Sequence, residues 1–353
     1  MDAAPFSHEE LQLAARNHGM PLEALRYDVT PVGLHYLLIH FDIPVVGPDW
    51  RLEVGGRVGR PLSLGLEDIR ARAPVTARVT MECAGNGRSR LQPRVVSQPW
   101  VLEAVGTGEW TGIPLADLLD EAGVLDDAVE LVFEGLDRGI DGGREELYGR
   151  SLTMEQARTN GVMLAYELNG APLPPQHGYP LRLVVPGWYG MTSVKWLSRI
   201  TAVSEPFAGY QQANAYRWRT HEDDPGTPVT RMAPRSLMAP PGIPDFMSRE
   251  RRVRVGEPVE IEGRAWSGWA PIASVAVSTD GGSTWSDARL EPSDGPFAWR
   301  RFTFSWTPQH AGHTELRCRT VDEAGNRQPD EPEWNVGGYG NNAVQRVAVD
   351  VTA

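Results

Sequence analysis

The last third of the chain is a series of short segments in which apolar and polar residues alternate, and this feature constrains the fold most. The segments cover residues 259–266, 272–278, 298–306, 314–321 and 344–351, and turns rich in Gly, Pro, Asp and Ser separate them. Short alternating strands at this spacing are typical of an immunoglobulin-like β-sandwich. We therefore expect a sandwich here, preceded by an extended linker or wrapping segment between residues 220 and 255.

The first two thirds show a mixed pattern. Strand-like alternation occurs at 51–54 and 77–81, and helical spacing occurs at 114–122 and 154–160. Ser7, with Glu10 three positions later, matches a capping box and predicts a helix that runs to Asn17. The 353 residues also exceed the roughly 250–300 at which one hydrophobic core stops growing. We expect an α+β domain over 1–229 and the sandwich over 230–353.

Charge and apolar patterning exclude several classes of partner. The formal net charge is −12, whereas nucleic-acid binding needs clustered positive charge, so no nucleic-acid partner is expected. Lys195 is the only lysine among 34 basic residues, and Trp196 follows it, which excludes the Lys-Ser or Lys-Thr of a phosphate-binding loop. The apolar runs are far shorter than the roughly 18–20 residues of a membrane-spanning helix, so no membrane partner is expected either.

The cysteines and the first residues bear on the cellular compartment. Cys83 and Cys318, in a chain with 2 cysteines, cannot build a disulfide framework or a four-ligand zinc site. Met1 to Phe6 lack the basic region and apolar stretch of a secretory leader. This predicts a cytoplasmic location, or a periplasmic one if a leader has been removed.

Two motifs match known signatures but lack their context. Residues 278–285 match the Asp-box of sialidase-type propellers, but the motif does not repeat, so we interpret Asp280-Gly281-Gly282 as a hairpin turn. Residues 85–90 carry the first two glycines of a dinucleotide fingerprint, but Arg90 stands at the third and would obstruct close packing. Neither motif predicts its usual function.

The stretch from Val79 to Arg90 is the first that carries chemistry. Cys83 leaves a predicted strand into a glycine-containing loop, which would expose its sulfur, and Arg88 and Arg90 would favour the thiolate. A thiolate is a good ligand for a soft metal. The alternative is a small buried hydrophobe beside solvated arginines, which is our interpretation of Cys318.

A second stretch combines three cationic or titratable residues. His177 and Arg182 flank an aromatic-proline turn, and Lys195 follows thirteen positions after Arg182. In a net-acidic chain, converging His, Arg and Lys suggest an anion such as a phosphate, because fixed donors in a partly dry site bind anions well. Scattered surface cations are the alternative.

Together with further segments, these two stretches resemble the sulfite oxidase family of molybdopterin enzymes. The matching segments are 16–18, 82–86 with Arg88, 133–137, 164–170, 177–187, 193–196 and 263–268. They follow the family's order and cover nearly the whole chain.

The resemblance implies a catalytic domain that holds molybdenum through molybdopterin and one cysteine, followed by an immunoglobulin-like domain that makes a homodimer. By position, the metal ligand is Cys83. The residues that match the family's cofactor contacts are Arg16, Asn17, His18, Cys83, Asp137, His177, Arg182, Ser193, Val194 and Lys195. Those that match its substrate pocket are Arg16, Arg88, Trp100 and Tyr216, with Tyr216 as a hydrogen-bond donor or proton relay.

The implied reaction is a two-electron oxygen transfer on a small anionic substrate, with sulfite oxidised to sulfate as the leading reaction. An external electron acceptor, for which a cytochrome c is a candidate, is expected because the family's haem-domain motif has no match here. Thr192 and Pro271 stand where sulfite oxidases carry arginines, so the cationic pocket is thinned. A reductase of an oxyanion or sulfoxide stays open. So does a non-enzymatic binding protein, which would leave Cys83 and Lys195 unexplained.

Overall fold

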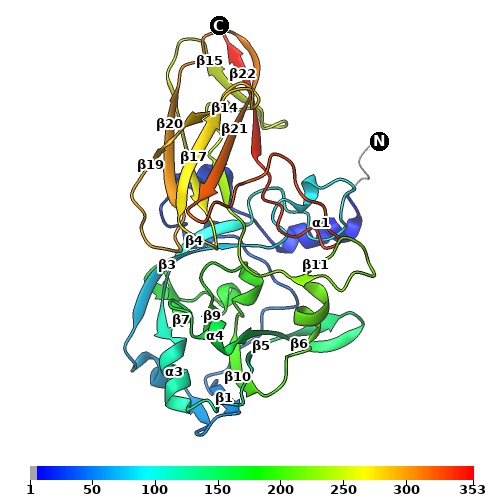
Figure 1. Ribbon diagram of the computed structural model, residues 1–353, viewed down its shortest axis with the longest axis vertical. Coiled ribbons are helices and arrows are strands. Elements are labelled where there is room, and N and C mark those ends of the chain that lie inside the picture. Colours follow the sequence, from blue (N-terminus) through cyan, green and yellow to red (C-terminus); the bar gives the residue numbers. More distant parts are fainter. Residues whose placement is uncertain (1–5) are drawn as a thin grey trace.

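The computed structural model describes residues 6–353 as two bodies stacked along the long axis of the molecule (Figure 1). A β-sandwich that contains the C-terminus forms one end, and a body of sheets and short helices forms the other. Met1 to Pro5, on which most of the leader prediction rests, lie outside the described residues.

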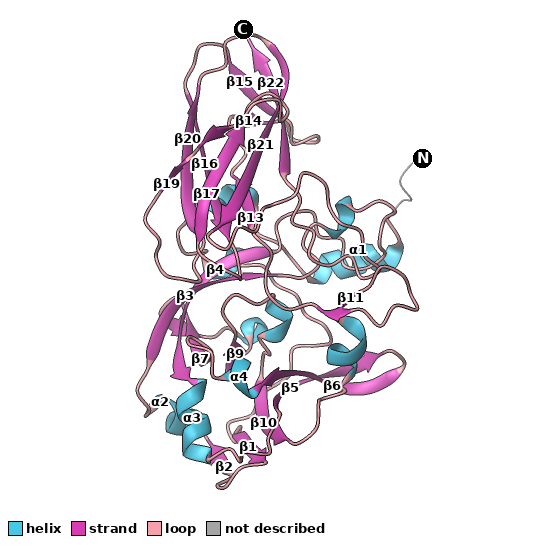
Figure 2. Cartoon of the chain, viewed as in Figure 1, coloured by secondary structure: helices cyan, strands magenta, loops and turns pink. Residues whose placement is uncertain are grey.

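The helices of the protein are short (Figure 2). The α-helices are α1 (His8–Arg16), α2 (Leu66–Arg70), α3 (Leu115–Ala122) and α4 (Met154–Ala157). The 3₁₀ helices are η1 (Leu22–Arg26), η2 (Val32–Leu34), η3 (Arg88–Arg90), η4 (Pro175–His177) and η5 (Gly190–Thr192), and η6 (Gln211–Ala215) is a π-helix.

Helix α1 begins as predicted. The Glu10 amide donates to Ser7 Oγ at 3.2 Å and the Ser7 amide to Glu10 Oε2 at 2.9 Å, so the capping box is confirmed. Helix α4 ends earlier than predicted. The Thr159 amide donates to Gln156 O in a tighter turn, and the chain then reverses at Gly161, whose φ is +92°.

Two sheets build the N-terminal body. One has the order β2-β1-β10-β5-β6, and the other has the order β3-β4-β7-β8, with β9 paired to β7. Their strands are β1 (Leu52–Gly56), β2 (Leu62–Leu64), β3 (Val75–Glu82), β4 (Val105–Pro114), β5 (Glu130–Asp141), β6 (Arg144–Thr153), β7 (Met163–Leu168), β8 (Ala171–Pro172), β9 (Arg182–Val184) and β10 (Leu197–Val203). The predicted mixture of helix and strand is confirmed. A large apolar core that includes Phe133, Leu164 and Leu197 lies between these elements.

The sandwich is confirmed as well. Its sheets have the orders β13-β16-β20-β19 and β14-β15-β22-β21-β17-β18. The strands are β13 (Arg235–Met238), β14 (Ile243–Pro244), β15 (Arg251–Arg254), β16 (Val259–Trp266), β17 (Ile272–Ser278), β18 (Ser286–Asp287), β19 (Arg289–Leu290), β20 (Arg300–Trp306), β21 (Gly312–Asp322) and β22 (Gln345–Thr352). Cys318 is buried in its core, and the turn at Asp280 joins the antiparallel pair β17 and β18, as expected.

The predicted linker is only partly irregular, which corrects the expectation for residues 220–255. A small ribbon of β11 (Arg217–Trp218) and β12 (Thr227–Pro228) precedes it, but β13 pairs with β16 and β15 pairs in parallel with β22. These segments are too short to show an alternating pattern. We propose to keep the domain boundary between 229 and 230, because β12 belongs to the first body and β13 to the sandwich.

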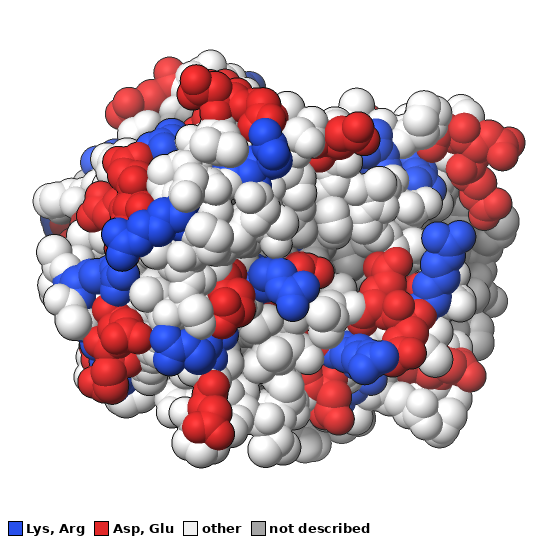
Figure 3. All heavy atoms as spheres, turned by 90° about the horizontal axis from the view of Figure 1, so that it is seen from below, with Lys and Arg blue, Asp and Glu red and all other residues white. Residues whose placement is uncertain are grey.

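An apolar cluster joins the two bodies. It combines Met20, Leu25 and Leu102 of the first body with Trp266 and Trp299 of the sandwich, all of them buried. At the far end of the N-terminal body, acidic and basic side chains are interspersed rather than gathered (Figure 3). Within residues 6–353, no helix has the length and apolar character that crossing a membrane requires.

Candidate active site

Cys83 follows the last residue of β3 and forms a wall shared by two cavities. Its amide donates to Ala104 O at 2.9 Å, which holds the residue at the strand end. The side chain is only 7% exposed, so the expectation of an exposed sulfur is wrong. Burial raises the pKa of the Cys83 thiol, and the nearby Arg88 guanidinium partly opposes this rise. Arg90 is exposed and adds nothing to this balance.

The inner cavity is narrow and lies between β5, β9 and the loops that follow η2, η4 and η5. Its lining residues are His35, Tyr36, Leu37, Leu38, His40, Met81, Cys83, Asp137, Tyr148, His177, Arg182, Gly190, Met191, Ser193 and Lys195. Five of the predicted cofactor residues besides Cys83 therefore meet here, from segments far apart in sequence. The alternative of scattered surface cations is excluded for these residues.

The cations of the inner cavity lack carboxylate partners. Arg182 donates to the carbonyls of His177 at 3.1 Å and Ser193 at 3.0 Å, and Lys195 Nζ donates to Leu38 O at 2.8 Å. Asp137 is the one acidic residue in the lining, and no ion pair among the described residues joins it to either cation. We call Asp137, His177, Arg182 and Lys195 the cavity cluster.

Burial shifts every titratable member of the cavity cluster toward its neutral form. It lowers the pKa of Lys195 to about 7, that of Arg182 to about 10 and that of His177 to about 2. It also raises the pKa of Asp137 to about 6. Asp137 Oδ1 and Arg182 Nε are buried without a hydrogen-bond partner in residues 6–353. Such a cluster is suited to an anion that would supply the missing acceptors.

A glycine lets these side chains approach one another. An added Cβ at Gly135 would lie 2.6 Å from both Asp137 Oδ1 and the Lys195 carbonyl oxygen. The pairing of β5 with β6 also shifts register between Glu134 and Arg138, which turns Asp137 toward the cavity. Strand β5 can therefore place Asp137 beside Lys195 only if residue 135 has no side chain.

The outer cavity is wider, with a volume of about 440 Å³. Its lining residues are Leu13, Arg16, Leu38, Ile39, His40, Cys83, Gly85, Arg88, Ser97, Gln98, Trp100, Asp141, Tyr210, Gln211, Asn214, Ala215, Tyr216, Arg217, Arg219, Val336, Gly337 and Tyr339. All four predicted substrate-pocket residues are among them. The sandwich contributes Val336, Gly337 and Tyr339, which the sequence did not single out.

Arg88 is held rigidly in the wall of the outer cavity. Its Nε donates to Gly337 O at 3.0 Å and its Nη1 to Gln98 O at 3.2 Å, and it lies over the Tyr339 ring at 5.3 Å. An added Cβ at Gly85 would lie 2.6 Å from this guanidinium. The first glycine of the 85–90 segment therefore makes room for Arg88 and not for a dinucleotide.

Three predicted site residues lie beside the cavities instead of lining them. Asn17 is buried, donates to Leu13 O and Gln98 Oε1, and accepts from the Ile39 amide. His18 is exposed and forms an isolated β-bridge with Leu37. Both therefore hold the segment 37–40, which does line the cavities. The Val194 side chain packs in the main core.

The two positions where arginines were expected also lie elsewhere. Thr192 is fully buried, lines neither cavity, and has no hydrogen-bond partner for Oγ1 among the described residues. Pro271 is exposed on the sandwich. An arginine at Pro271 would not reach Cys83 without rearrangement, so the thinned charge cannot be assigned to that residue.

His40 and Tyr148 were missed by the sequence analysis. His40 lines both cavities, and Tyr216 Oη lies 2.6 Å from its Nε2. Tyr148 stacks on His40 with ring centroids 4.6 Å apart, and it donates from its hydroxyl to Met191 O. Lone aromatic residues in an apolar run carry no sequence signal that separates a site from a core.

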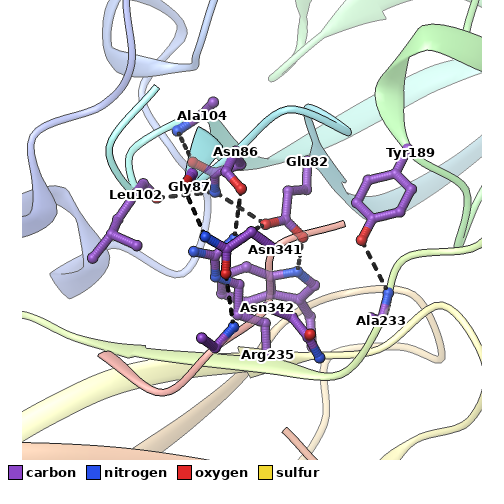
Figure 4. Close-up of polar contacts among 12 residues, drawn as sticks. Glu82, Asn86, Gly87, Leu102, Ala104, Tyr189, Ala233, Arg235, Asn341 and Asn342 are labelled. Carbon is purple, nitrogen blue, oxygen red and sulfur yellow. Dashed lines mark hydrogen bonds and ion pairs between the residues drawn. The ribbon is translucent and has the colours of Figure 1, made fainter. Parts of the chain in front are cut away.

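A different polar cluster precedes Cys83 and joins the two bodies (Figure 4). Glu82 accepts from Arg235 Nη1 at 2.6 Å, from Asn86 Nδ2 at 3.0 Å and from Trp266 Nε1 at 2.9 Å. Glu82 and Arg235 are both 1% exposed. We call Glu82, Asn86, Arg235 and Trp266 the cross-domain cluster.

Comparisons with known proteins agree with this geometry. Residues 40–211 match the family described as the oxidoreductase molybdopterin binding domain, and residues 241–352 match the Mo-co oxidoreductase dimerisation domain. Over its full length the fold is similar to the sulfane dehydrogenase SoxCD from Paracoccus pantotrophus, with a TM-score of 0.80 and 27% identity, covering 100% of this chain and 94% of that one.

Similarity to curated proteins covers the chain as well. Human mitochondrial sulfite oxidase is 34% identical over 99% of this chain and 67% of its own length, and chicken sulfite oxidase is 36% identical over 90% and 72%. An Arabidopsis nitrate reductase is 29% identical over 98% of this chain and 40% of its own. The protein is therefore an enzyme whose cofactor is molybdenum held by molybdopterin. The chain belongs to the sulfite oxidase family of molybdopterin-dependent oxidoreductases.

Proposed function

We propose that this enzyme oxidises sulfite to sulfate and passes the electrons to an external acceptor. The observation that carries the proposal is the position of Cys83, on the wall between a cavity of unpaired cations and a wider cavity with arginines. The first suits the anionic end of a cofactor, and the second suits an anionic substrate. Two relatives named sulfite oxidase, at 34% and 36% identity, support the same reaction.

The inner cavity fits molybdopterin by the chemistry of its donors. Arg182, Lys195, His177 and Ser193 would hold the phosphate and pterin, because buried cations without carboxylate partners gain most from an added anion. The Cys83 thiolate would bind the metal. When bound, the cofactor supplies a two-electron oxygen transfer that amino-acid side chains cannot perform. Asn17, His18 and Val194 would act indirectly, by holding segments that line the site.

The outer cavity would bind the substrate. Arg88 is fixed by two carbonyls and is buried, so its charge acts at a set place, whereas Arg16 at the end of α1 is exposed and adjustable. Trp100 is buried beside Cys83 and restricts access of water. Burial holds the pKa of Tyr216 well above its ordinary value, so its hydroxyl stays protonated and can hydrogen bond at neutral pH.

Electrons and assembly complete the proposal. We propose a one-electron carrier such as a cytochrome c as the acceptor, and a homodimer formed through the sandwich. The match of residues 241–352 to a dimerisation domain supports the dimer. Light scattering on the purified protein tests it, and a monomer at micromolar concentration would contradict it.

A second candidate is the reduction of an oxyanion such as nitrate, or reaction of a larger sulfur compound. The outer cavity of about 440 Å³ is much larger than a sulfite ion, and a nitrate reductase and a sulfane dehydrogenase are among the relatives. The cavity volume favours this candidate over sulfite, whereas the identity of the curated relatives favours sulfite.

The deciding experiment compares the directions of catalysis in one preparation. The enzyme, expressed in a host that makes molybdopterin, is assayed with sulfite and ferricyanide, and separately with nitrate and a reduced viologen dye. Metal analysis of the same sample should show about one molybdenum per chain. Turnover with sulfite supports the proposal. Turnover with nitrate alone, in a molybdenum-loaded sample, would replace it.

A further inference from the structure

His40 and Tyr216 form a hydrogen-bonded pair at the junction of the two cavities. Nε2 of His40 lies 2.6 Å from Oη of Tyr216, and His40 lines both cavities while Tyr216 lines the outer one. The two rings meet at 79°, with centroids 6.2 Å apart, so the contact is edge-on and leaves the Tyr216 ring free to face Tyr339. Residues 176 positions apart are thus joined beside Cys83.

The direction of this hydrogen bond follows from the surroundings of His40. Cations at Lys195, Arg150 and Arg16 and stacked Tyr148 surround it, and burial with these cations lowers its pKa to about 3. The imidazole is therefore neutral at physiological pH, and the tyrosine hydroxyl is protonated. Nε2 accepts and the hydroxyl of Tyr216 donates, which requires the proton of His40 to sit on Nδ1.

The backbone that carries His40 is clamped on three sides. Lys195 Nζ donates to Leu38 O at 2.8 Å, the Ile39 amide donates to Asn17 Oδ1 at 2.8 Å, and Arg16 Nη2 approaches His40 O at 3.4 Å. Arg150 lies over the Tyr216 ring at 5.4 Å. Neither partner can move far, so the position of the Tyr216 hydroxyl is set by His40 more than by the substrate.

We propose that His40 is a positioning residue that accepts the hydroxyl proton of Tyr216 in a hydrogen bond and so turns the free lone pairs of that oxygen toward the outer cavity. Tyr216 then faces the reacting groups as a proton acceptor, with His40 as the next group on the path. This deepens the proposed function and rests on it for the identity of the substrate.

The proton balance of the proposed reaction shows why such a path is needed. Sulfite and water give sulfate, two protons and two electrons, and the external carrier takes the electrons. For each proton, an O–H bond of water breaks and one forms on Tyr216 Oη, while the original Oη–H bond breaks and an N–H bond forms on Nε2 of His40. The proton leaves His40 toward solvent from Nδ1. In a reductase the same path runs in the opposite direction.

Three variants separate this role from a packing role. Gln at position 40 places an amide oxygen near the position of Nε2, whereas Asn places its amide near Nδ1 and Leu has no acceptor. We expect His40→Leu and His40→Asn to lower kcat about 10- to 100-fold with little change in KM, between the effects of a neutral hydrogen bond and of general acid–base catalysis. His40→Gln should recover most of kcat. Exposed His310→Leu is the matched control and should be unchanged.

A double variant tests whether His40 acts through Tyr216. In a Tyr216→Phe background, His40→Leu should cause no further loss of kcat, and each variant should keep the molybdenum content of the wild type. Additive losses, a failure of Gln to rescue, or loss of molybdenum in His40→Leu would each overturn the proposal. Molybdenum loss would make His40 a cofactor residue.

A readout that needs no substrate keeps the proposal distinct from the proposed function. Nitrogen NMR of histidine-labelled holoenzyme, with His40 assigned by loss of its signals in His40→Gln, should show a neutral Nδ1–H tautomer from about pH 5 to 9. A protonated ring or the opposite tautomer would overturn the proposal even if sulfite is the substrate. A correct tautomer in an enzyme that does not oxidise sulfite would leave the pair intact and reject only the substrate.

Discussion

Glu82 and Cys83 are neighbours in sequence but belong to two buried polar regions that treat charge differently. In the cross-domain cluster, Glu82 receives three donors, one of them the guanidinium of Arg235. In the cavity cluster, Arg182 and Lys195 donate only to carbonyl oxygens, and Asp137 pairs with neither. A buried charge costs several kcal/mol unless it is paired, about the amount that separates a folded domain from an unfolded one.

The difference shows which region serves the fold and which serves a ligand. The cross-domain cluster has a carboxylate matched to a cation across the two bodies, so it needs nothing more to be stable. The cavity cluster lacks an anion, and the pKa values of its members are displaced toward neutrality as a result. Cys83, held between them, inherits a rigid backbone from the first and a ligand site from the second.

The largest expected effect is at the junction of the two clusters. Cys83→Ser should lower turnover by at least about 100-fold, because a hydroxyl is a far poorer ligand than a thiolate for a soft metal. The backbone contact of residue 83 to Ala104 O would remain, so circular dichroism should be unchanged. Cys318→Ser, in the sandwich core, is the control and should keep full turnover. Equal effects of the two substitutions would remove Cys83 as the ligand.

The next effect concerns the paired cluster. Arg235→Met should destabilise the cofactor-free protein by about 3–5 kcal/mol, because it leaves the Glu82 carboxylate buried without a countercharge. Adding Glu82→Gln should recover much of this loss. Urea unfolding followed by tryptophan fluorescence measures both variants. If Arg235→Met unfolds like the wild type, the pairing does not stabilise the contact between the bodies.

The unpaired cluster should respond in the opposite direction. Lys195→Met should leave the stability of the cofactor-free protein unchanged or raised, because it removes a buried cation that has no carboxylate partner. Cofactor retention should weaken about 10- to 150-fold, the value of one charge-assisted hydrogen bond of about 1.5–3 kcal/mol. Molybdenum content after dialysis measures it. Destabilisation like that of Arg235→Met would erase the difference between the clusters.

The same residue predicts a pH dependence. Burial lowers the pKa of Lys195 to about 7, below its ordinary value of 10.5, so the unfolded chain binds more protons between these values. The stability contribution of Lys195 in cofactor-free protein should therefore rise as pH increases from about 7 to 10.5. Melting temperatures across this range should rise less in Lys195→Met. Identical profiles would mean that Lys195 already has a countercharge.

The smallest expected effect is at the rim, where the sandwich meets the outer cavity. Tyr339 donates to Ala215 O at 2.9 Å, so Tyr339→Phe should cost about 1 kcal/mol and keep the ring beside Arg88. Urea unfolding of this variant and of exposed Tyr27→Phe should separate the two. A loss above about 3 kcal/mol would place this contact with the cross-domain cluster instead.

Much of the fold could be predicted because its signals are local. The alternation at 259–266 and 272–278 coincides with β16 and β17, and the Ser7 capping box coincides with the start of α1. Strands β13 and β15 were missed because four residues are too few to show a period, and their pairing with β16 and β22 is decided by distant segments. Helix α4 was predicted too long because the tighter turn at Thr159 leaves helical spacing intact.

The site divides along the same line. Cys83, Arg182 and Lys195 stood out by residue type and by their rarity or position in the chain, so sequence alone indicated a soft-metal ligand and an anion site. His40, Tyr148 and Tyr339 look like ordinary core residues until the chain brings them beside Cys83. Asn17 and His18 show the reverse, because a matching motif lies next to the cavities without lining them.

The sequence by itself determined the sandwich, the mixed body before it, and the residue types that could hold a metal and an anion, because strand periodicity and side-chain chemistry are properties of nearest neighbours. Only the tertiary structure decided which cations stay unpaired. Whether Arg235 meets Glu82 while Lys195 meets a carbonyl depends on contacts across 153 and 157 positions of the chain. Pairing of buried charge is a property of the packed interior, and no local pattern records it.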